Sequence, residues 1–110
     1  MPFFLYQLAY SPEAIKGLVA NPSDRKAAAA KLAESMGGKL HEFFFCFGQY
    51  DVVCIIEAPS DAAWAAGALT VAAAGTTSAA VTTKLLTVEE AMEAMKAAGK
   101  AAGVYKPPMA

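Results

Sequence analysis

The pattern of apolar and polar positions along this 110-residue chain predicts four strands. Each is a dense apolar or β-branched run of strand length, bounded by glycine, proline or a polar turn sequence. The fourth run, "TTSAAVTTKLLT", is rich in β-branched residues, which favour strands. The predicted strands are residues 2–10, 39–47, 51–58 and 76–87.

Helices are predicted between the strands, where capping residues precede stretches with helical periodicity. Ser11-Pro12 suits a helix start, because serine caps the first turn and proline fits within it. Asn21-Pro22 repeats that signal, so the first helix is expected to break and restart. The other predicted helices are residues 23–36, 60–75 and 88–102, the last opened by a capping box of Thr87 and Glu90, with Met92 and Met95 facing the core.

The resulting order, β-α-β-β-α-β-α, is typical of an α+β fold of the ferredoxin-like type. This arrangement has a four-stranded antiparallel sheet with helices on one face. We expect a single domain over residues 1–103, followed by a C-terminal tail at residues 104–110.

The predicted strands are apolar on both faces, whereas a strand with one face in water would alternate. Consecutive apolar residues occupy positions 3–5, 43–45, 52–53 and 55–56. The uncovered sheet face is therefore expected to pack on a second sheet, as in a dimeric α+β barrel. A hydrophobic content of 56% is high for so small a domain and favours the same conclusion. The first expected partner is the chain itself, as a homodimer or a higher oligomer.

Charge and composition argue against several other partners. The net charge of −1, without a cluster of Lys and Arg, is not typical of nucleic-acid binding. The uncharged stretch at residues 62–81 is weakly apolar and contains Gly-Thr-Thr, so no membrane span is expected. The start "MPFFLYQLAY" does not resemble a signal peptide, and we expect a cytoplasmic protein. Two cysteines without a CxxC spacing and one histidine predict no metal site, and no cofactor motif is found.

The four residues Gly48-Gln49-Tyr50-Asp51 separate the second and third predicted strands. Glycine supplies the positive φ of a hairpin, and an aspartate can accept hydrogen bonds from backbone N–H groups of the turn. These residue types favour a structural corner. The alternative is that Tyr50 or Asp51 points into a ligand cleft.

His41 and Glu57 are the candidate catalytic pair, with Asp51 as an alternative acid or base. A three-residue loop at 48–50 would set His41 opposite Glu57, on one sheet face with Phe43, Phe45 and Asp51. A carboxylate beside an imidazole can hold it as a general base. A two-residue loop would shift the register by one and separate the pair. A charge pair at the strand ends with no further role is the simpler interpretation.

The remaining candidate ligand contacts are two tyrosines and two cations. Tyr6 and Tyr10 fall on one face of the first strand, where they can line an aromatic pocket or simply pack. Lys84 can bind a carboxylate or extend along the sheet edge. Arg25, in the first turn of its helix, can be engaged by nearby carboxylates.

The chain resembles the GYD-domain family of small bacterial proteins. The resemblance is carried by "FGQYDVVCIIEAP" and "TTKLLTVEEAMEAMKAA", and it extends from about residue 2 to residue 98. The glycine, tyrosine and aspartate of the family name match Gly48, Tyr50 and Asp51. The resemblance implies the dimeric α+β barrel fold but no settled activity. The hairpin is also similar to effector-binding domains of the leucine-responsive regulator family, although this chain lacks their helix-turn-helix.

Three functions are compatible with these features. The leading hypothesis is a homo-oligomeric binding module for an apolar or amphipathic small metabolite, because aromatic residues with few polar groups are typical of ligand pockets. The alternative is a cofactor-free oxygenase or isomerase that uses His41 with Glu57 or Asp51. The third is a structural oligomer with no ligand.

Overall fold

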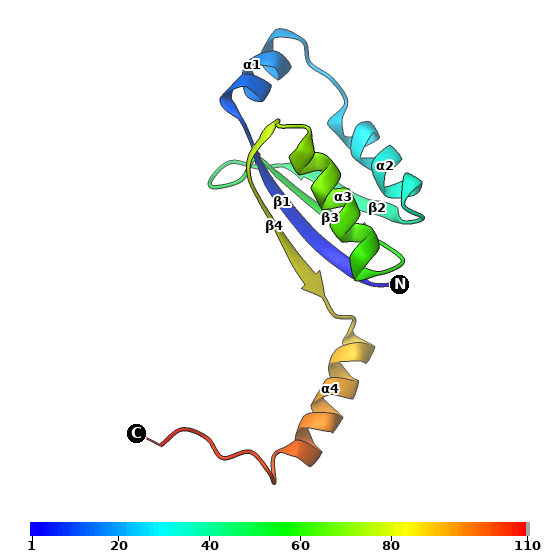
Figure 1. Cartoon of the computed structure of the whole chain (residues 1–110), viewed down its shortest axis with the longest axis vertical. Helices are drawn as coiled ribbons and strands as arrows, with labels where there is room; N and C mark the ends of the chain where they lie inside the picture. The colour runs from blue at the N-terminus through cyan, green and yellow to red at the C-terminus, as the bar shows by residue number, and fades with distance from the viewer. Residues whose placement is uncertain (110) are drawn as a thin grey trace.

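The structure is a computed structural model that describes residues 1–109, so Ala110 of the predicted tail lies outside the described residues. The elements follow the order β-α-α-β-β-α-β-α (Figure 1). The strands are β1 (Phe3–Tyr10), β2 (Lys39–Phe45), β3 (Val52–Glu57) and β4 (Thr77–Leu85). The helices are α1 (Pro12–Ala20), α2 (Arg25–Ser35), α3 (Asp61–Ala73) and α4 (Val88–Ala101).

The four strands form one antiparallel sheet in the order β2-β3-β1-β4. Helices α2 and α3 lie over one face of this sheet, and α1 lies beyond one end (Figure 1). This arrangement confirms the predicted α+β fold of ferredoxin-like type. It also confirms the predicted break in the first helical region.

The helix starts have a local cause in short polar side chains. The Ser11 hydroxyl accepts a hydrogen bond from the backbone N–H of Ala14 at 3.2 Å, as predicted from Ser11-Pro12. The second helix starts later than the Asn21-Pro22 signal predicts. Asn21 instead closes α1, and the Asp24 carboxylate caps α2 by accepting from the N–H of Ala27 at 2.9 Å.

The hydrophobic core lies between the sheet and the two helices, α2 and α3, that cover it. Alternate residues of β1 and β3 point into it, as the period of two in a strand requires. Ala33 of α2 and Trp64 of α3 close the core from the helix side. Its buried members are Phe4, Tyr6, Leu8, Ala33, Val52, Cys54, Ile56, Ala58 and Trp64.

The other sheet face, which we call the open face, carries the alternate residues of the same strands. Its members include Phe3, Leu5 and Gln7 of β1, Val53, Ile55 and Glu57 of β3, and Phe44 of β2. No helix of residues 1–109 covers this face (Figure 1). It is mostly apolar, as expected from strands that do not alternate.

Gly38 joins α2 to β2 at a point of close backbone contact. A methyl group at this position would overlap the carbonyl oxygen of Glu57. Gly38→Ala is therefore expected to lower the free energy of unfolding by about 1–3 kcal/mol, because the backbone must shift. Gly17→Ala is the matched control: it meets only open space in α1 and should be neutral or stabilising by about 0.5–1 kcal/mol. Urea unfolding followed by circular dichroism measures both, and an equal effect would contradict the contact.

Helix α4 departs from the expectation that its methionines face the core. It starts at a complete capping box between Thr87 and Glu90, as predicted, and the hydrogen bonds from Thr87 lower the pKa of the Glu90 carboxyl. The helix then projects away from the sheet and buries no residue (Figure 1). Met92 and Met95 are 50% and 68% exposed, so the prediction that they pack within their own chain is wrong.

Candidate functional site

A partly open cavity of about 110 Å³, which we call the internal cavity, lies between the sheet and helices α2 and α3. Leu32, Phe43 and Val71 contribute apolar walls, while Tyr6 and Tyr10 come from one face of β1, as predicted. The cavity is roomier than a single water needs, since one water occupies roughly 10–15 Å³ by this kind of measure. It is the best-enclosed hollow among those described and the primary candidate site.

Arg25 is the cation at this cavity. It is half-buried at the start of α2, and it makes no ion pair with any carboxylate of residues 1–109. The same residue lines a more open hollow of about 280 Å³ between α1 and the start of α2. Tyr10 and Thr76 also line both spaces. Arg25 therefore stands at the mouth between solvent and the internal cavity, and the expected engagement by nearby acidic residues does not occur.

Burial raises the pKa of two ionisable groups on the cavity wall, so both keep their protons to a higher pH than usual. Burial raises the pKa of the Cys54 thiol to about 12. Burial, and to a lesser degree the neighbouring Cys54, raises the pKa of the Tyr6 hydroxyl. The Cys54 thiol contacts the Tyr6 carbonyl oxygen at 3.6 Å. These groups leave Arg25 as the charged group of the cavity wall near neutral pH.

The raised thiol pKa predicts a loss of stability in alkali. The ordinary thiol pKa is 9.0, so the unfolded chain releases this proton at lower pH than the folded chain does. The free energy of unfolding should therefore fall as the pH rises from about 9 to 12. Cys54→Val should reduce this slope, and Cys46→Ser, at the other free cysteine, should not. Urea midpoints at several values of pH test this, and equal slopes in all three proteins would contradict it.

Gly48 has a φ of 138°, in the region that favours glycine. This agrees with the prediction that glycine supplies a positive φ in the turn between β2 and β3. Asp51 does not cap its own turn. Its carboxylate accepts a hydrogen bond from the backbone N–H of Tyr10 at 2.8 Å, and its own N–H donates to the Leu8 carbonyl. Asp51 thus joins the hairpin to the end of β1. Tyr50 is half-buried in the turn and is not among the residues that line the internal cavity.

His41 and Glu57 meet, but not through the register that was expected. The backbone pairs Phe45 with Val52, and the N–H of Cys46 donates to the Asp51 carbonyl at 2.8 Å, which leaves a four-residue loop at 47–50. A β-bulge between Leu40 and Glu42 then shifts the pairing by one more residue, so that Lys39 rather than His41 pairs with Glu57 along the backbone. His41 is the extra residue, and its Nε2 lies 2.9 Å from Oε1 of Glu57.

This pair lies on the open face, with the imidazole 5.3 Å from the ring of Phe3. Phe43 and Phe45 lie on the helix side instead, so their predicted place beside His41 is wrong. The one-residue difference in register moves both to the opposite face. Asp51 precedes β3 and Glu57 ends it, so the three candidate catalytic residues do not converge. His41 and Glu57 are absent from the wall of the internal cavity.

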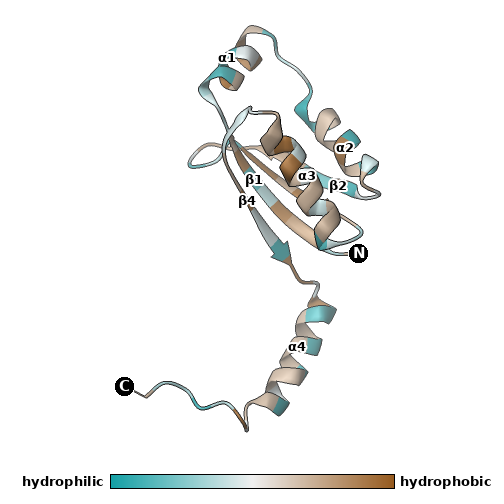
Figure 2. Ribbon diagram, viewed as in Figure 1, coloured by the Kyte–Doolittle hydropathy of each residue, from teal (hydrophilic) through white to brown (hydrophobic). Residues whose placement is uncertain are grey.

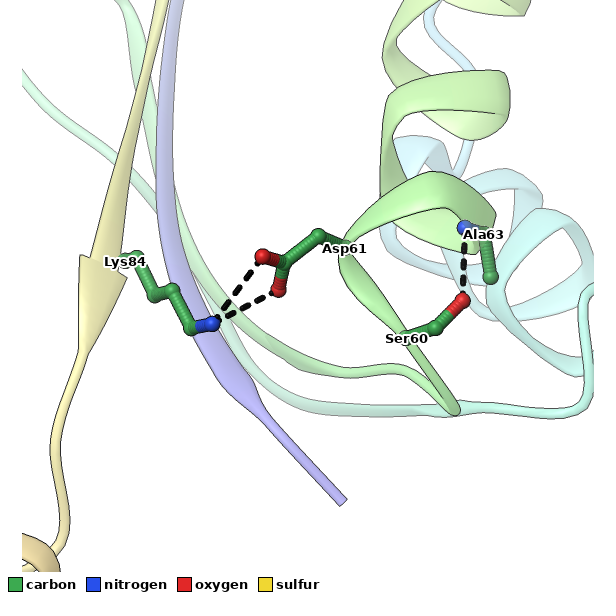
Figure 3. A network of polar contacts seen from close by, with 4 residues as sticks. All are labelled: Ser60, Asp61, Ala63 and Lys84. Carbon is green, nitrogen blue, oxygen red and sulfur yellow. Dashed lines mark hydrogen bonds and ion pairs between the residues drawn. The ribbon is translucent and has the colours of Figure 1, made fainter.

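Lys84 forms an ion pair within its own chain. Its Nζ lies 2.8 Å and 3.0 Å from the two oxygens of Asp61 in the first turn of α3 (Figure 3). The same figure shows the Ser60 hydroxyl accepting from the N–H of Ala63, which caps α3. Nearby, the Trp64 indole N–H donates to the Thr82 hydroxyl at 2.9 Å. These contacts tie α3 to β4 at one end of an apolar groove.

Sequence patterns alone did not identify Asp61 as the partner of Lys84, nor Arg25 as the cation at the cavity mouth. In the sequence, Asp61 is a typical residue for the start of a helix, and Arg25 is one of several charged residues in a helix turn. Neither position alone indicates a partner. Within residues 1–109, no cluster of side chains suited to a metal ion occurs, and no helix is both long and apolar enough to cross a membrane.

Comparison with known proteins places this geometry in a family. The GYD domain model matches residues 4–95. The crystal structure of MtbAldR is similar with a TM-score of 0.54 and 12% identity, over 78% of this chain and 52% of that one. A protein of unknown function from Nitrosomonas europaea has 21% identity and a TM-score of 0.43, over 79% of this chain and 91% of that one.

No curated protein matches the chain. At 12% identity, the likeness to MtbAldR shows the fold alone, and this chain spans about half the length of that structure. The family model covers most of the chain, including the Gly48-Gln49-Tyr50-Asp51 hairpin and strand β4. The chain belongs to the GYD-domain family.

Proposed function

We propose that this protein is a homo-oligomeric binding module for a small amphipathic metabolite that carries a carboxylate. The observation that carries the proposal is the internal cavity with Arg25 at its mouth. An apolar enclosure with a few polar groups is typical of small-molecule sites. A guanidinium without a carboxylate partner suits a ligand anion, which it can bind through two parallel hydrogen bonds.

The size of the cavity limits the apolar part of the ligand. An engineered apolar cavity of roughly 150 Å³ in another protein holds benzene. At about 110 Å³, this cavity suits a group of similar or slightly smaller size. The carboxylate then lies towards the outer hollow, where solvent and Arg25 share its charge. Tyr6 adds a hydroxyl that remains protonated near neutral pH.

The oligomer in this proposal forms through the open face. Leu5, Val53 and Ile55 are only half-buried within one chain, and Phe44 is 59% exposed. Packing two such faces together removes this apolar surface from water, at a gain of about 25 cal/mol per Å². A two-fold axis brings the same patch of each subunit together, which matches the dimeric α+β barrel arrangement.

The carboxylate preference is tested with benzoate and benzyl alcohol, which share a ring and differ in charge. By calorimetry, benzoate should bind at least about 10-fold more tightly, and Arg25→Gln should remove that preference, since a charged hydrogen bond contributes about 1.5–3 kcal/mol. Lys26→Gln, on the exposed side of the same helix turn, is the matched control and should change nothing. A preference for benzoate that persists in Arg25→Gln would overturn the assignment.

The rival function is a cofactor-free oxygenase or isomerase, and the 2.9 Å contact between His41 and Glu57 favours it. Its ligand would lie on the open face, on the other side of the sheet from the cavity. Native mass spectrometry of the purified protein identifies any ligand that is retained, and NMR then locates it. Shifts at the His41 imidazole would support the enzyme, while shifts at Tyr6 and Tyr10 would support the binding module. An oligomer in which neither site responds would favour the structural role.

A further inference from the structure

Helix α4 has an apolar stripe that no part of its own chain covers. Val88, Met92 and Met95 recur at the helical spacing of four and three residues, so they lie on one side. Their exposed fractions are 71%, 50% and 68%. The charged residues Glu93 and Lys96 pair with each other at 3.7 Å. Glu93 lies on the other side of the helix from the stripe, and Lys96, four residues after Met92, borders it. An amphipathic helix of this kind normally buries its apolar side against another element.

A groove lined mainly by apolar residues lies between α3 and β4, on the helix-covered side of the sheet. It has a volume of about 570 Å³. Helix α3 contributes small and apolar residues, and Figure 2 shows that this helix is strongly apolar over part of its length. Leu69 of α3, one of its lining residues, is 69% exposed, whereas Val81 of β4 pairs with Gln7 and its side chain belongs to the open face. The groove is lined by Phe4, Tyr6, Asp61, Trp64, Ala65, Ala68, Leu69, Ala72, Ala80, Val81, Thr82 and Lys84.

The groove lies beside the part of the sheet, at β4, that neither α2 nor α3 covers. Helix α2 contacts β2, and Trp64 of α3 packs on the rings of Phe4 and Tyr6 of β1. Residues 79–84 of the edge strand β4 are exposed. Helix α4 has 14 residues and is about 21 Å long, while α3 has 13 residues and is about 20 Å long, at 1.5 Å per residue. Alanines on α3 permit close approach of a second helix.

We propose that α4 of one subunit docks in the α3–β4 groove of a second copy of this chain. The second copy is the occupant that the geometry favours, because only Leu86 and Thr87 separate β4 from α4, and α4 projects away from α3 and β4 of its own chain (Figure 1). The capping box fixes that start. Each chain carries one stripe and one groove. If each of two subunits docks its α4 in the groove of the other, the pair forms a closed two-fold dimer in which both stripes and both grooves are covered.

The exchange is independent of any ligand and adds to the pairing of open faces rather than replacing it. The stripe meets apolar rather than charged residues along most of the groove, and the Asp61–Lys84 ion pair lies at its end. The charged flank of α4, with Glu93 and Lys96, then stays in water. A different partner seated in the groove would still leave the apolar stripe of α4 uncovered.

Cysteine cross-linking of the full chain tests the exchange. In a Cys46→Ser background, Leu69→Cys is combined with Met92→Cys or with Met95→Cys, one turn apart on the stripe, and the protein is oxidised at micromolar concentration. Docking between subunits predicts covalent dimers on a non-reducing gel for at least one pair. The matched pair of Leu69→Cys with Glu93→Cys, on the charged flank, and each single cysteine variant should give at least about 10-fold less dimer.

The other outcomes overturn the proposal. A fast-migrating monomer would show that α4 folds back on its own chain, and the absence of cross-links at both stripe positions would exclude the groove. A second measurement uses Met92→Lys and Glu93→Lys, which place the same residue on the stripe and on the flank. Only Met92→Lys should weaken association, by at least about 10-fold in the dissociation constant from analytical ultracentrifugation. Equal effects would contradict docking of the stripe. Because α4 buries no residue of its own chain, neither substitution removes a core contact.

Discussion

Phe44→Asp is expected to weaken subunit association by at least about 100-fold, while Phe45→Asp leaves it nearly unchanged. The two phenylalanines are neighbours on β2 and are 59% and 60% exposed, so they differ mainly in the face they occupy. Phe44 pairs with Val53 on the open face, and Phe45 pairs with Val52 on the helix side. The proposed pairing of open faces would place a carboxylate from each subunit in an apolar interface. At 1.4 kcal/mol for each factor of ten, a cost of about 1.4 kcal/mol per subunit accounts for this effect.

Sedimentation velocity over a range of concentrations measures the dissociation constants of the wild type and both variants. Circular dichroism shows whether each variant keeps its secondary structure, because an unfolded variant would not report on the interface. If Phe45→Asp dissociates the protein and Phe44→Asp does not, the subunits associate through the helix side instead. Equal dissociation by both would also contradict the pairing of open faces.

Trp64→Ala is expected to lower the free energy of unfolding by about 3–5 kcal/mol, the usual cost of removing a large buried aromatic side chain. Trp64 is 3% exposed and forms an edge-to-face contact with Tyr6 at 4.9 Å. It also donates a hydrogen bond to Thr82, which connects α3 to β4. For a small domain this cost is a large share of a total stability of about 5–15 kcal/mol. The substitution should therefore leave the protein partly unfolded near its normal working temperature.

Trp64→Phe is the control for this prediction. It keeps an aromatic ring against Phe4 and Tyr6 and loses the indole hydrogen bond, at an expected cost of about 1–2 kcal/mol. Urea unfolding must be followed by circular dichroism, because both variants lack the only tryptophan of the chain. If alanine and phenylalanine cost the same, the hydrogen bond rather than packing would account for the stabilisation.

Local patterns were sufficient for most of the fold. A dense apolar run of strand length depends only on neighbouring positions, and such runs correctly placed β1 and β3. The same is true of the Ser11 cap, the capping box at Thr87 and the positive φ of Gly48. The apolar character of both sheet faces also followed from composition alone. The predicted start of α2 was wrong, because Asp24 rather than Asn21 caps this helix.

The contact between His41 and Glu57 shows where sequence reasoning ends. The expected loop length was wrong by one residue, and the contact forms instead from a β-bulge at His41, while Lys39 is the backbone partner of Glu57. Neither loop length nor bulge is encoded in the alternation of residue types, because both depend on how two strands pair. The same one-residue difference moved Phe43 to the opposite face.

The sequence by itself determined the strands, the helix starts, the apolar open face and the family, because these depend on local spacing and residue type. Only the tertiary structure decided which residues share a site. Arg25 and Tyr6 are far apart in the chain, and packing of α2 on the sheet brings both to one cavity. Helix α4 has an amphipathic pattern that is readable in the sequence, yet its exposed stripe follows from its direction after Leu85. The direction of a helix, the register of paired strands and the enclosure of a cavity arise from contacts between distant segments. No local pattern of residues specifies them.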